Sequence, residues 1–239
     1  MQFEPGHLYH VYNRGNNSEK VFFTRANYLF FLEKIKKHVL SHADILAWCL
    51  MPSHFHLMIH VNRVEIGRTE RVTGGAEVTQ RVTPEHAITQ RVTTLNQSNE
   101  YPELPTLNEN SHPLSSKPQV RSLNDSFAIV LRTYTRAIQR QEHRTGSLFQ
   151  ERTKASCLTQ SDGITPSWFQ TSFGVIINIV PPEREYPQVC FNYIHCNPVK
   201  DRLVKLPEEW EFSSARDYAG LRNGKLIRKE RADEFGLVY

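Results

Sequence analysis

The pattern of apolar and polar residues predicts two strands, each with a buried face and a polar face. Residues 7–12 alternate and lead into the turn signal Asn13-Arg-Gly15, so they predict a first strand. Residues 54–61 alternate as well, and successive side chains of a strand point to opposite faces. One face of this strand carries Phe55, Leu57 and Ile59, and the other carries His54, His56, Met58 and His60. The first face predicts a core and the second a site.

Apolar residues at helical spacing predict two helices, and a short apolar run predicts a third strand. The first helix starts at Thr24 and continues to about residue 39. The run 44–51 is ended by Pro52, and we expect it to pair with the histidine strand as a hairpin. The second helix begins with Asp125 as its N-cap residue. Its inner face carries Phe127, Val130, Leu131, Tyr134 and Ile138.

The composition changes abruptly after Val61. A decapeptide period appears in Thr69-Glu-Arg-Val-Thr73, Thr79-Gln-Arg-Val-Thr83 and Thr89-Gln-Arg-Val-Thr93, and a stretch rich in Asn, Ser, Pro and Glu follows. Such a segment carries too little apolar content to bury a core. We therefore predict a disordered, low-complexity insertion at 62–123. It separates an N-terminal half, 1–61, from a C-terminal half, 124–220, of the same domain, and residues 221–239 form a tail.

A last helix is expected near residue 190. The preceding segment, 161–187, contains four prolines and can be read as strand or helix around 173–180. Proline disfavours a helix interior, so we predict a short helix of about ten residues that starts after Pro187 and ends at Pro198. Tyr193 and Asn197 are four residues apart and therefore share one face of it.

Composition sets broad limits. The 239 residues are 39% hydrophobic and 10% aromatic, which is enough for a buried core. No run approaches the roughly 18 apolar residues of a membrane span, and the first residues do not resemble a signal peptide, so we expect a cytoplasmic protein without a membrane partner. The four cysteines form no C-x-x-C pair, which argues for reduced thiols and against a zinc ribbon.

Charge is more informative in its distribution than in its total. The net charge of +4 is mild, but Arg132, Arg136 and Arg140 recur every four residues and form a basic stripe on the second helix. A phosphate backbone is one partner for such a stripe, and a solvated helix face is the alternative reading.

The histidine strand is the strongest candidate for chemistry. An i, i+2 pair such as His54 and His56 places two imidazoles where one metal ion can meet both. If Asn197 faces them, its amide oxygen completes a nitrogen and oxygen shell that suits Mg²⁺ or Mn²⁺, with Tyr193 beside it. Zinc would normally need a third histidine or a carboxylate. The alternatives are structural histidines, a packed Tyr193 with Tyr134 as rival nucleophile, and an asparagine that merely ends its helix.

Several segments together resemble the single-tyrosine HUH transposases. They are Pro52-Ser-His-Phe-His56, Tyr134-Thr, Gly146-Ser-Leu-Phe-Gln150 and Tyr193-Ile-His-Cys-Asn-Pro-Val-Lys200, and they are most similar to the REP-associated tyrosine transposase branch. The resemblance covers residues 5–61, 125–156 and 189–220. It implies an α+β fold: a ferredoxin-like or RRM-like antiparallel sheet with helices packed on one face, interrupted by the long insertion, and with the tyrosine on a helix across from the histidines.

The resemblance also implies roles. His54 and His56 would bind the metal with Asn197 as third ligand, and Tyr193 would attack single-stranded DNA to form a 5′-phosphotyrosine. Further residues would contact the DNA or its hairpin: Arg14, Arg132, Arg136, Arg140 and Lys154. The cofactor would be Mg²⁺ or Mn²⁺, and the enzyme a monomer or a homodimer.

Two other functions are compatible with the same residues. One is a catalytically inactive protein that binds single-stranded or hairpin DNA and derives from such a transposase. The other is a metal-dependent hydrolase that uses His54, His56 and a carboxylate such as Glu151.

Overall fold

The computed structural model describes residues 1–67, 120–159, 168–171, 174–177 and 182–239, with only the backbone described for 168–171, 174–177 and 182–185. The decapeptide repeats, and with them the disorder predicted for most of 62–123, lie outside the described residues. Residues Met1–Gly67 and Val120–Tyr239 form one unit, to which the following description applies.

Four antiparallel strands form the central sheet in the order β2-β3-β1-β6. The strands are β1 (Leu8–Arg14), β2 (Ala43–Met51), β3 (His54–Val61) and β6 (Lys154–Cys157). Helix α1 (Arg25–His38) follows β1, and α2 (Leu123–Gln141) precedes β6, which gives the order β1-α1-β2-β3-α2-β6. This is the ferredoxin-like arrangement, so the predicted α+β fold is confirmed, as is the β2-β3 hairpin.

The N-cap residue was predicted correctly for α1 but not for α2. Thr24 is the N-cap residue of α1, as predicted, and the Asn27 side chain accepts a hydrogen bond from its N–H at 2.9 Å. The predicted cap of α2, Asp125, is wrong: the cap is Ser122, whose Oγ accepts from the Asp125 N–H at 3.1 Å. The Asp125 carboxylate in turn accepts from the Ser122 N–H at 3.0 Å. Asp125 therefore occupies the third helical position of a capping box.

A small ribbon joins the two halves of the chain next to α2. Strand β4 (Glu65–Gly67) pairs antiparallel with β5 (Val120–Ser122), and Gly67 lies opposite Val120. Both strands fall within the predicted insertion, so its first and last residues are ordered and lie side by side.

Helix α3 (Pro182–Lys200) is longer than predicted, since it includes both Pro187 and Pro198. A proline removes one backbone donor and strains a helix without forbidding it. Here Phe191 and Ile194, both fully buried against the sheet, supply packing that compensates for the lost hydrogen bonds. The prediction of a short helix was wrong because it counted the prolines and not this packing.

The remaining elements are short. They are the hairpin of β7 (Trp168–Thr171) and β8 (Gly174–Ile177), the 3-10 turns Asn16–Ser18 and Pro207–Glu209, and the helices α4 (Ala215–Tyr218) and α5 (Lys229–Glu234). Residues 174–177, left open by the sequence, are therefore a strand. Among the described residues, no helix has the length and apolar character needed to cross a membrane.

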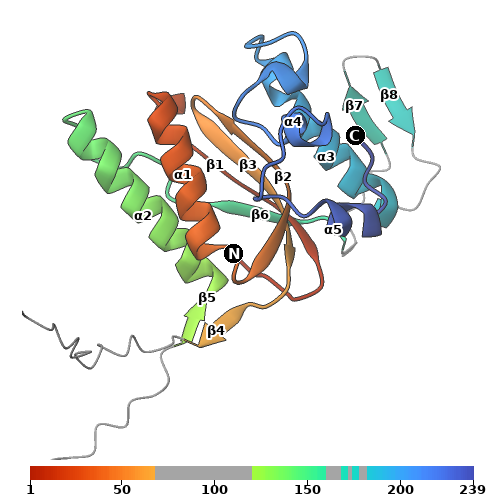
Figure 1. The fold of residues 1–239 in the computed structure, drawn as a ribbon, viewed down its shortest axis with the longest axis horizontal. Helices are drawn as coiled ribbons and strands as arrows, with labels where there is room; N and C mark the ends of the chain where they lie inside the picture. The colour runs from red at the N-terminus through yellow and green to blue at the C-terminus, as the bar shows by residue number, and fades with distance from the viewer. Residues whose placement is uncertain (68–119, 160–167, 172–173, 178–181) are drawn as a thin grey trace, which may run out of the picture. The chain divides into compact units, whose positions relative to one another are not determined.

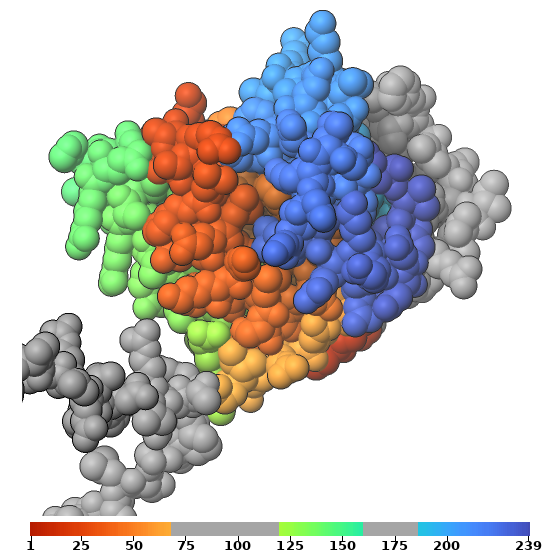
Figure 2. Space-filling model, in the orientation of Figure 1, coloured from red at the N-terminus to blue at the C-terminus, as the bar shows by residue number. Residues whose placement is uncertain are grey.

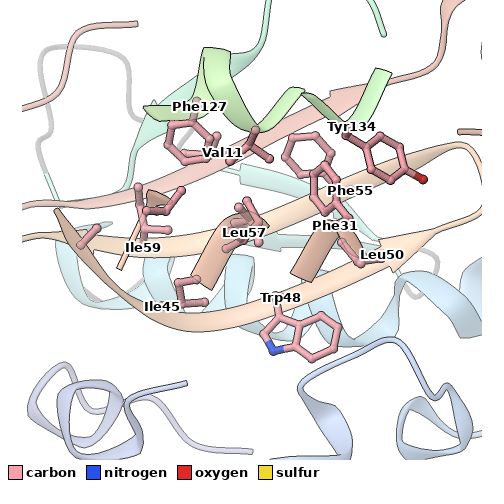
Figure 3. Packing of buried hydrophobic residues seen from close by; sticks show 14 of the residues in the cluster. Val11, Phe31, Ile45, Trp48, Leu50, Phe55, Leu57, Ile59, Phe127 and Tyr134 are labelled. Carbon is pink, nitrogen blue, oxygen red and sulfur yellow. The ribbon is translucent and has the colours of Figure 1, made fainter. Parts of the chain in front are cut away.

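Both faces of the sheet are covered (Figure 1): α1 and α2 lie side by side on one face, and α3 lies on the other. The core on the α1-α2 side contains Phe55, Leu57 and Ile59, with Phe127 and Tyr134 of α2 packed above them (Figure 3). The core on the α3 side is smaller and is built around Leu8, Leu46, Met58, Phe191 and Ile194. The two faces of β3 that its alternation predicted therefore pack into two different cores.

The edge of the sheet at β2 is covered by the C-terminal part of the chain. The Leu50 N–H donates to the Phe212 carbonyl at 2.8 Å, and the Ser214 N–H donates to the Trp48 carbonyl at 2.9 Å. The Phe212 ring also stacks on Tyr28 of α1 at a centroid distance of 3.8 Å. In Figure 2 the C-terminal segment accordingly packs against α1. The residues after 205 therefore complete the fold at this edge.

Replacing Leu57 by alanine should lower the free energy of unfolding by about 2–5 kcal/mol, because the side chain is fully buried under α1 and α2. The matched control is Leu29→Ala on α1, where the leucine is 44% exposed and the change should stay within about 0.5 kcal/mol. Urea unfolding followed by circular dichroism measures both. Equal losses in the two variants would contradict the placement of Leu57 in the core.

Candidate functional site

The register of β1 against its two neighbours brings six side chains to one face of the sheet. Tyr12 lies opposite His56 of β3 and opposite Lys154 of β6. Arg14 lies opposite His54, and His10 is two residues from Tyr12 on the same face. The histidine face of β3 therefore continues across β1 to β6.

His56 is held by a second histidine. The His10 Nε2 and His56 Nδ1 atoms are 2.8 Å apart, and the ring centroids are 5.0 Å apart with the ring planes inclined by 23°. Burial lowers the pKa of His10 to about 4 and lowers that of His56 well below its ordinary value. The other nitrogen of His56, Nε2, is buried and has no hydrogen-bond partner in the described part of the chain. A neutral imidazole with a buried, unused nitrogen is suited to bind a metal.

His54 lies beside Asn197. Its Nδ1 is 3.0 Å from the Ser53 Oγ. Burial lowers the pKa of His54, while the charge of Asp201 and a hydrogen bond with the Asn197 side chain act in the opposite direction. Asn197 is 5% exposed and its Nδ2 donates to the Tyr193 carbonyl at 3.1 Å. The amide predicted as third ligand thus lies in contact with one of the two predicted histidine ligands.

Tyr193 projects from α3 toward the same histidines. Its ring meets His56 edge to face, with centroids 5.3 Å apart, and lies 6.0 Å from His10. The Lys200 Nζ is 4.6 Å from the centre of the tyrosine ring. Tyr193 remains 37% exposed, so part of this residue is open to a large substrate.

The position of α3 is fixed from behind by a buried polar contact. His195 points away from the site, and its Nε2 is 2.7 Å from the Ser214 Oγ. Ser214 in turn accepts a hydrogen bond from the Trp48 N–H of β2 at 2.9 Å. The helix that carries Tyr193 is therefore tied to the C-terminal segment and, through it, to the sheet.

A pocket of about 320 Å³ opens between β1 and α3. Its walls include the rings of His10, Tyr12, His56, Tyr186 and Tyr193. Lys154 approaches it from the edge strand, with its Nζ 5.8 Å from the centre of the Tyr12 ring. The site therefore combines aromatic walls with positive charge at its rim.

These side chains fit a divalent cation. Within the described residues no three His, Cys, Asp or Glu side chains are grouped as a metal site, so a shell built here depends on the amide of Asn197. Two imidazoles and one amide oxygen leave positions for water and for a substrate oxygen, a combination that suits Mg²⁺ or Mn²⁺. The buried and unpartnered Nε2 of His56 is the observation that supports this fit.

The predicted residues fall into two groups. His54, His56, Tyr193 and Asn197 come together, and Arg14 and Lys154 lie on the same face of the sheet. The basic stripe does not join them. It is exposed on α2, which covers the opposite face, and it consists of Arg132, Arg136 and Arg140.

The rival candidates are placed elsewhere. Tyr134 is fully buried in the core below α2, where its hydroxyl donates to the Val21 carbonyl at 2.7 Å and burial raises its pKa. Glu151 is exposed before β6 and forms no metal-binding group with His54 and His56. Neither residue is available for the chemistry that the sequence left open for it.

Four residues of the site had no predicted role: His10, Tyr12, Tyr186 and Lys200. His10 and Tyr12 share one face of the predicted first strand, and that alternation was the signal that could have identified them. Lys200 lies seven residues after Tyr193, which is two helical turns, and that spacing was the signal that could have placed it on the face of Tyr193.

No protein-family model and no curated protein matches this chain. A solved structure of a REP-associated tyrosine transposase bound to a REP hairpin matches it with a TM-score of 0.47 and 14% sequence identity. The match covers 96% of this chain and 87% of that chain. At this level of similarity, the chemistry of the site is inferred from its own side chains.

The buried contact between His195 and Ser214 behind α3 should make the stability of the protein depend on pH. Burial lowers the pKa of His195 to about 3, whereas the unfolded chain binds a proton near pH 6.5. The free energy of unfolding should therefore fall as the pH falls, by about 3 kcal/mol between pH 6.5 and 4 from this group. The variant His195→Gln lacks this imidazole, so its free energy of unfolding should not contain this pH-dependent loss. The free energy of unfolding of wild type minus that of the variant should therefore decrease by about 3 kcal/mol from pH 6.5 to pH 4.

Urea unfolding at pH 7, 5.5 and 4 measures this difference. The control is His143→Gln, at an exposed position after α2, which accounts for the loss of one histidine. A stability difference between wild type and His195→Gln that does not change with pH would refute a neutral, buried His195.

Proposed function

We propose that the protein cleaves and rejoins single-stranded DNA that carries a hairpin, through a 5′-phosphotyrosine intermediate on Tyr193. One observation carries the proposal: the accessible ring of Tyr193 lies 5.3 Å from the buried ring of His56, although the two residues come from distant parts of the chain. A phenol beside two neutral imidazoles is an arrangement suited to attack on a phosphate held between them.

In the proposed reaction the phenol oxygen of Tyr193 forms a bond to phosphorus as the bond from phosphorus to the 3′ oxygen breaks. The phenol proton leaves, and the released 3′ oxygen takes up a proton to become a hydroxyl group. The phosphodiester is thus exchanged for a phosphotyrosine ester, and a later attack by a 3′-hydroxyl reverses the step. No nucleotide cofactor is needed, because the energy of the original bond is retained.

His54, His56 and Asn197 would hold a Mg²⁺ or Mn²⁺ ion, which when bound neutralises charge on the scissile phosphate and orients it. The ammonium group of Lys200, close to the Tyr193 ring, would add positive charge beside the reacting phenol. Burial of His56 and partial burial of His54 limit the access of water to the side of the site below α3.

Two surfaces would contact the DNA. The aromatic pocket has room for one unpaired base, which could stack on Tyr12 or Tyr186 next to the scissile phosphate. Arg14 and Lys154 would bind the backbone on either side of it. The stripe on α2 would bind a different part of the same DNA, such as the hairpin stem, from the other side of the sheet.

A DNA-binding protein without activity is the second candidate, and it would share both surfaces. The arrangement around Tyr193 favours the enzyme, because a structural tyrosine would not need to remain accessible beside the buried His56. The hydrolase is disfavoured, since Glu151 is not grouped with the histidines. We expect the protein to act in the cytoplasm.

Wild-type protein incubated with Mn²⁺ and a hairpin DNA that has a single-stranded flank should give an adduct that survives denaturation. Tyr193→Phe should reduce this adduct to background, because the attacking oxygen is removed. Tyr134→Phe should retain it, although it loses a buried hydrogen bond worth about 1 kcal/mol.

Denaturing gel electrophoresis with labelled DNA measures the adduct. DNA binding by wild type without any adduct would favour the inactive binding protein. Metal-dependent cleavage that persists in Tyr193→Phe would favour the hydrolase instead.

A second experiment should distinguish the role of Arg14 and Lys154 from the role of the basic stripe on α2. Arg14→Ala combined with Lys154→Ala should lower both the affinity for hairpin DNA and the adduct yield at saturating DNA, because these residues adjoin the site. Replacing all three arginines of the stripe by alanine should lower the affinity for DNA. It should also reduce the slope of log affinity against log salt concentration by about 0.9 for each lost phosphate contact. The adduct yield at saturating DNA should stay unchanged.

Fluorescence anisotropy at several salt concentrations gives the affinities. If the triple variant binds like wild type at every salt concentration, the stripe is only a solvated helix face.

A further inference from the structure

We propose that His10 is a positioning residue for His56: it accepts a hydrogen bond from the His56 Nδ1–H and thereby fixes the tautomer in which the His56 Nε2 lone pair is free for a divalent cation. The inference rests on the proposed function in one respect, the metal shell of His54, His56 and Asn197. It adds a residue and a tautomer that the motif does not specify.

The contact between the rings of His10 and His56 requires one hydrogen between the two nitrogens that face each other. The His10 Nε2 and His56 Nδ1 atoms are 2.8 Å apart, a hydrogen-bond distance between two nitrogens of which one must donate and the other accept. In a neutral imidazole only one nitrogen carries hydrogen. The direction of this bond therefore decides whether the His56 Nε2 carries a hydrogen or a lone pair.

The surroundings of His56 select one direction. If His10 donated, the hydrogen of His56 would sit on Nε2, which is buried and meets no acceptor among the described residues. A buried N–H without an acceptor is among the more unfavourable arrangements in a protein. If His56 donates through Nδ1, the buried Nε2 atom presents only a lone pair, which a cation can use.

The strand geometry keeps His10 in place for this role. Its ring is stacked on the ring of Tyr12 from the same face of β1, with centroids 4.7 Å apart, and it meets the Tyr193 ring edge to face at 6.0 Å. A histidine that binds metal commonly donates its second N–H to a fixed acceptor, which orients the ring. Here the acceptor would be another imidazole, supplied by the neighbouring strand.

His60 provides a matched comparison on the same face of β3. It is also buried, and its Nδ1 lies 3.0 Å from the Asn62 Oδ1. It has no contact with His10 or Tyr193 among the interactions described for the site. His60→Leu therefore removes a buried histidine from the same strand face without touching the proposed pair.

Nuclear magnetic resonance on the metal-free wild-type protein gives the first test. Long-range ¹H–¹⁵N correlations of the imidazole rings distinguish the two neutral tautomers. We expect His56 to carry its hydrogen on Nδ1. Detection of the Nε2–H form of His56 as the main species would overturn the inference, whatever the variants do.

Metal binding without DNA gives the second test. Calorimetric titration with Mn²⁺ should show binding weakened roughly 10- to 100-fold in His10→Leu, which removes the acceptor. His10→Gln should stay within a few-fold of wild type, because its Oε1 atom can reach the position of the imidazole Nε2 and accept the same hydrogen. His60→Leu should also bind Mn²⁺ like wild type, and circular dichroism shows whether each variant is folded.

The outcomes separate this inference from the proposed function. If His10→Leu is folded and binds Mn²⁺ like wild type, or if His10→Gln loses as much affinity as His10→Leu, His10 does not act as an acceptor. Absence of Mn²⁺ binding by wild type also overturns the role. A wild type that forms no DNA adduct, but in which the expected Mn²⁺ series and tautomer are found, refutes the enzyme and leaves the role of His10 intact.

Discussion

The hydrogen-bond register between β1 and β3 is the constraint on which both the core and the site depend. It places Val11 beside Leu57 on the face below α1 and α2, and Tyr12 beside His56 on the other face. A shift by one residue would bring the histidines into the large core and turn the apolar face of β3 away from that core, toward the α3 side of the sheet. The free energy of burying Phe55, Leu57 and Ile59 therefore also fixes the direction in which the histidines point. The site is held by residues that take no part in its chemistry.

Helix α3 is the second element on which the site depends. It covers the histidine face of the sheet and removes part of the solvent from it. Phe191 and Ile194 anchor the helix over β2 and β3, so His56 is buried while Tyr193 stays at the rim. Neutral imidazoles and an accessible phenol are then produced by one and the same packing arrangement. The cost of desolvating polar rings is offset by contacts between them, of which the His10–His56 bond is the shortest in the site.

Local signals predicted the fold well and the site in part. The alternation of β3, the capping residue Thr24 and the stop at Pro52 depend on neighbours in sequence, and they gave the hairpin, the first helix and the histidine face correctly. The extent of α3 was missed, because the packing of Phe191 outweighs a local preference of Pro187 and Pro198. His10 was missed because its partner is chosen by strand pairing, which the spacing within one strand does not reveal. The arginine stripe was correctly placed on one helix face, but no local pattern could show that this face turns away from the histidines.

The β4-β5 ribbon has a consequence for how this domain can change during evolution. Because Gly67 and Val120 lie opposite each other, the chain departs from the domain and returns to it at adjacent points. The entropy of closing a loop between such points grows only slowly with its length, so segments of very different size are compatible with the same sheet. A short turn or an entire foreign domain could therefore join these two residues while the strands and helices on either side of the ribbon keep their alignment.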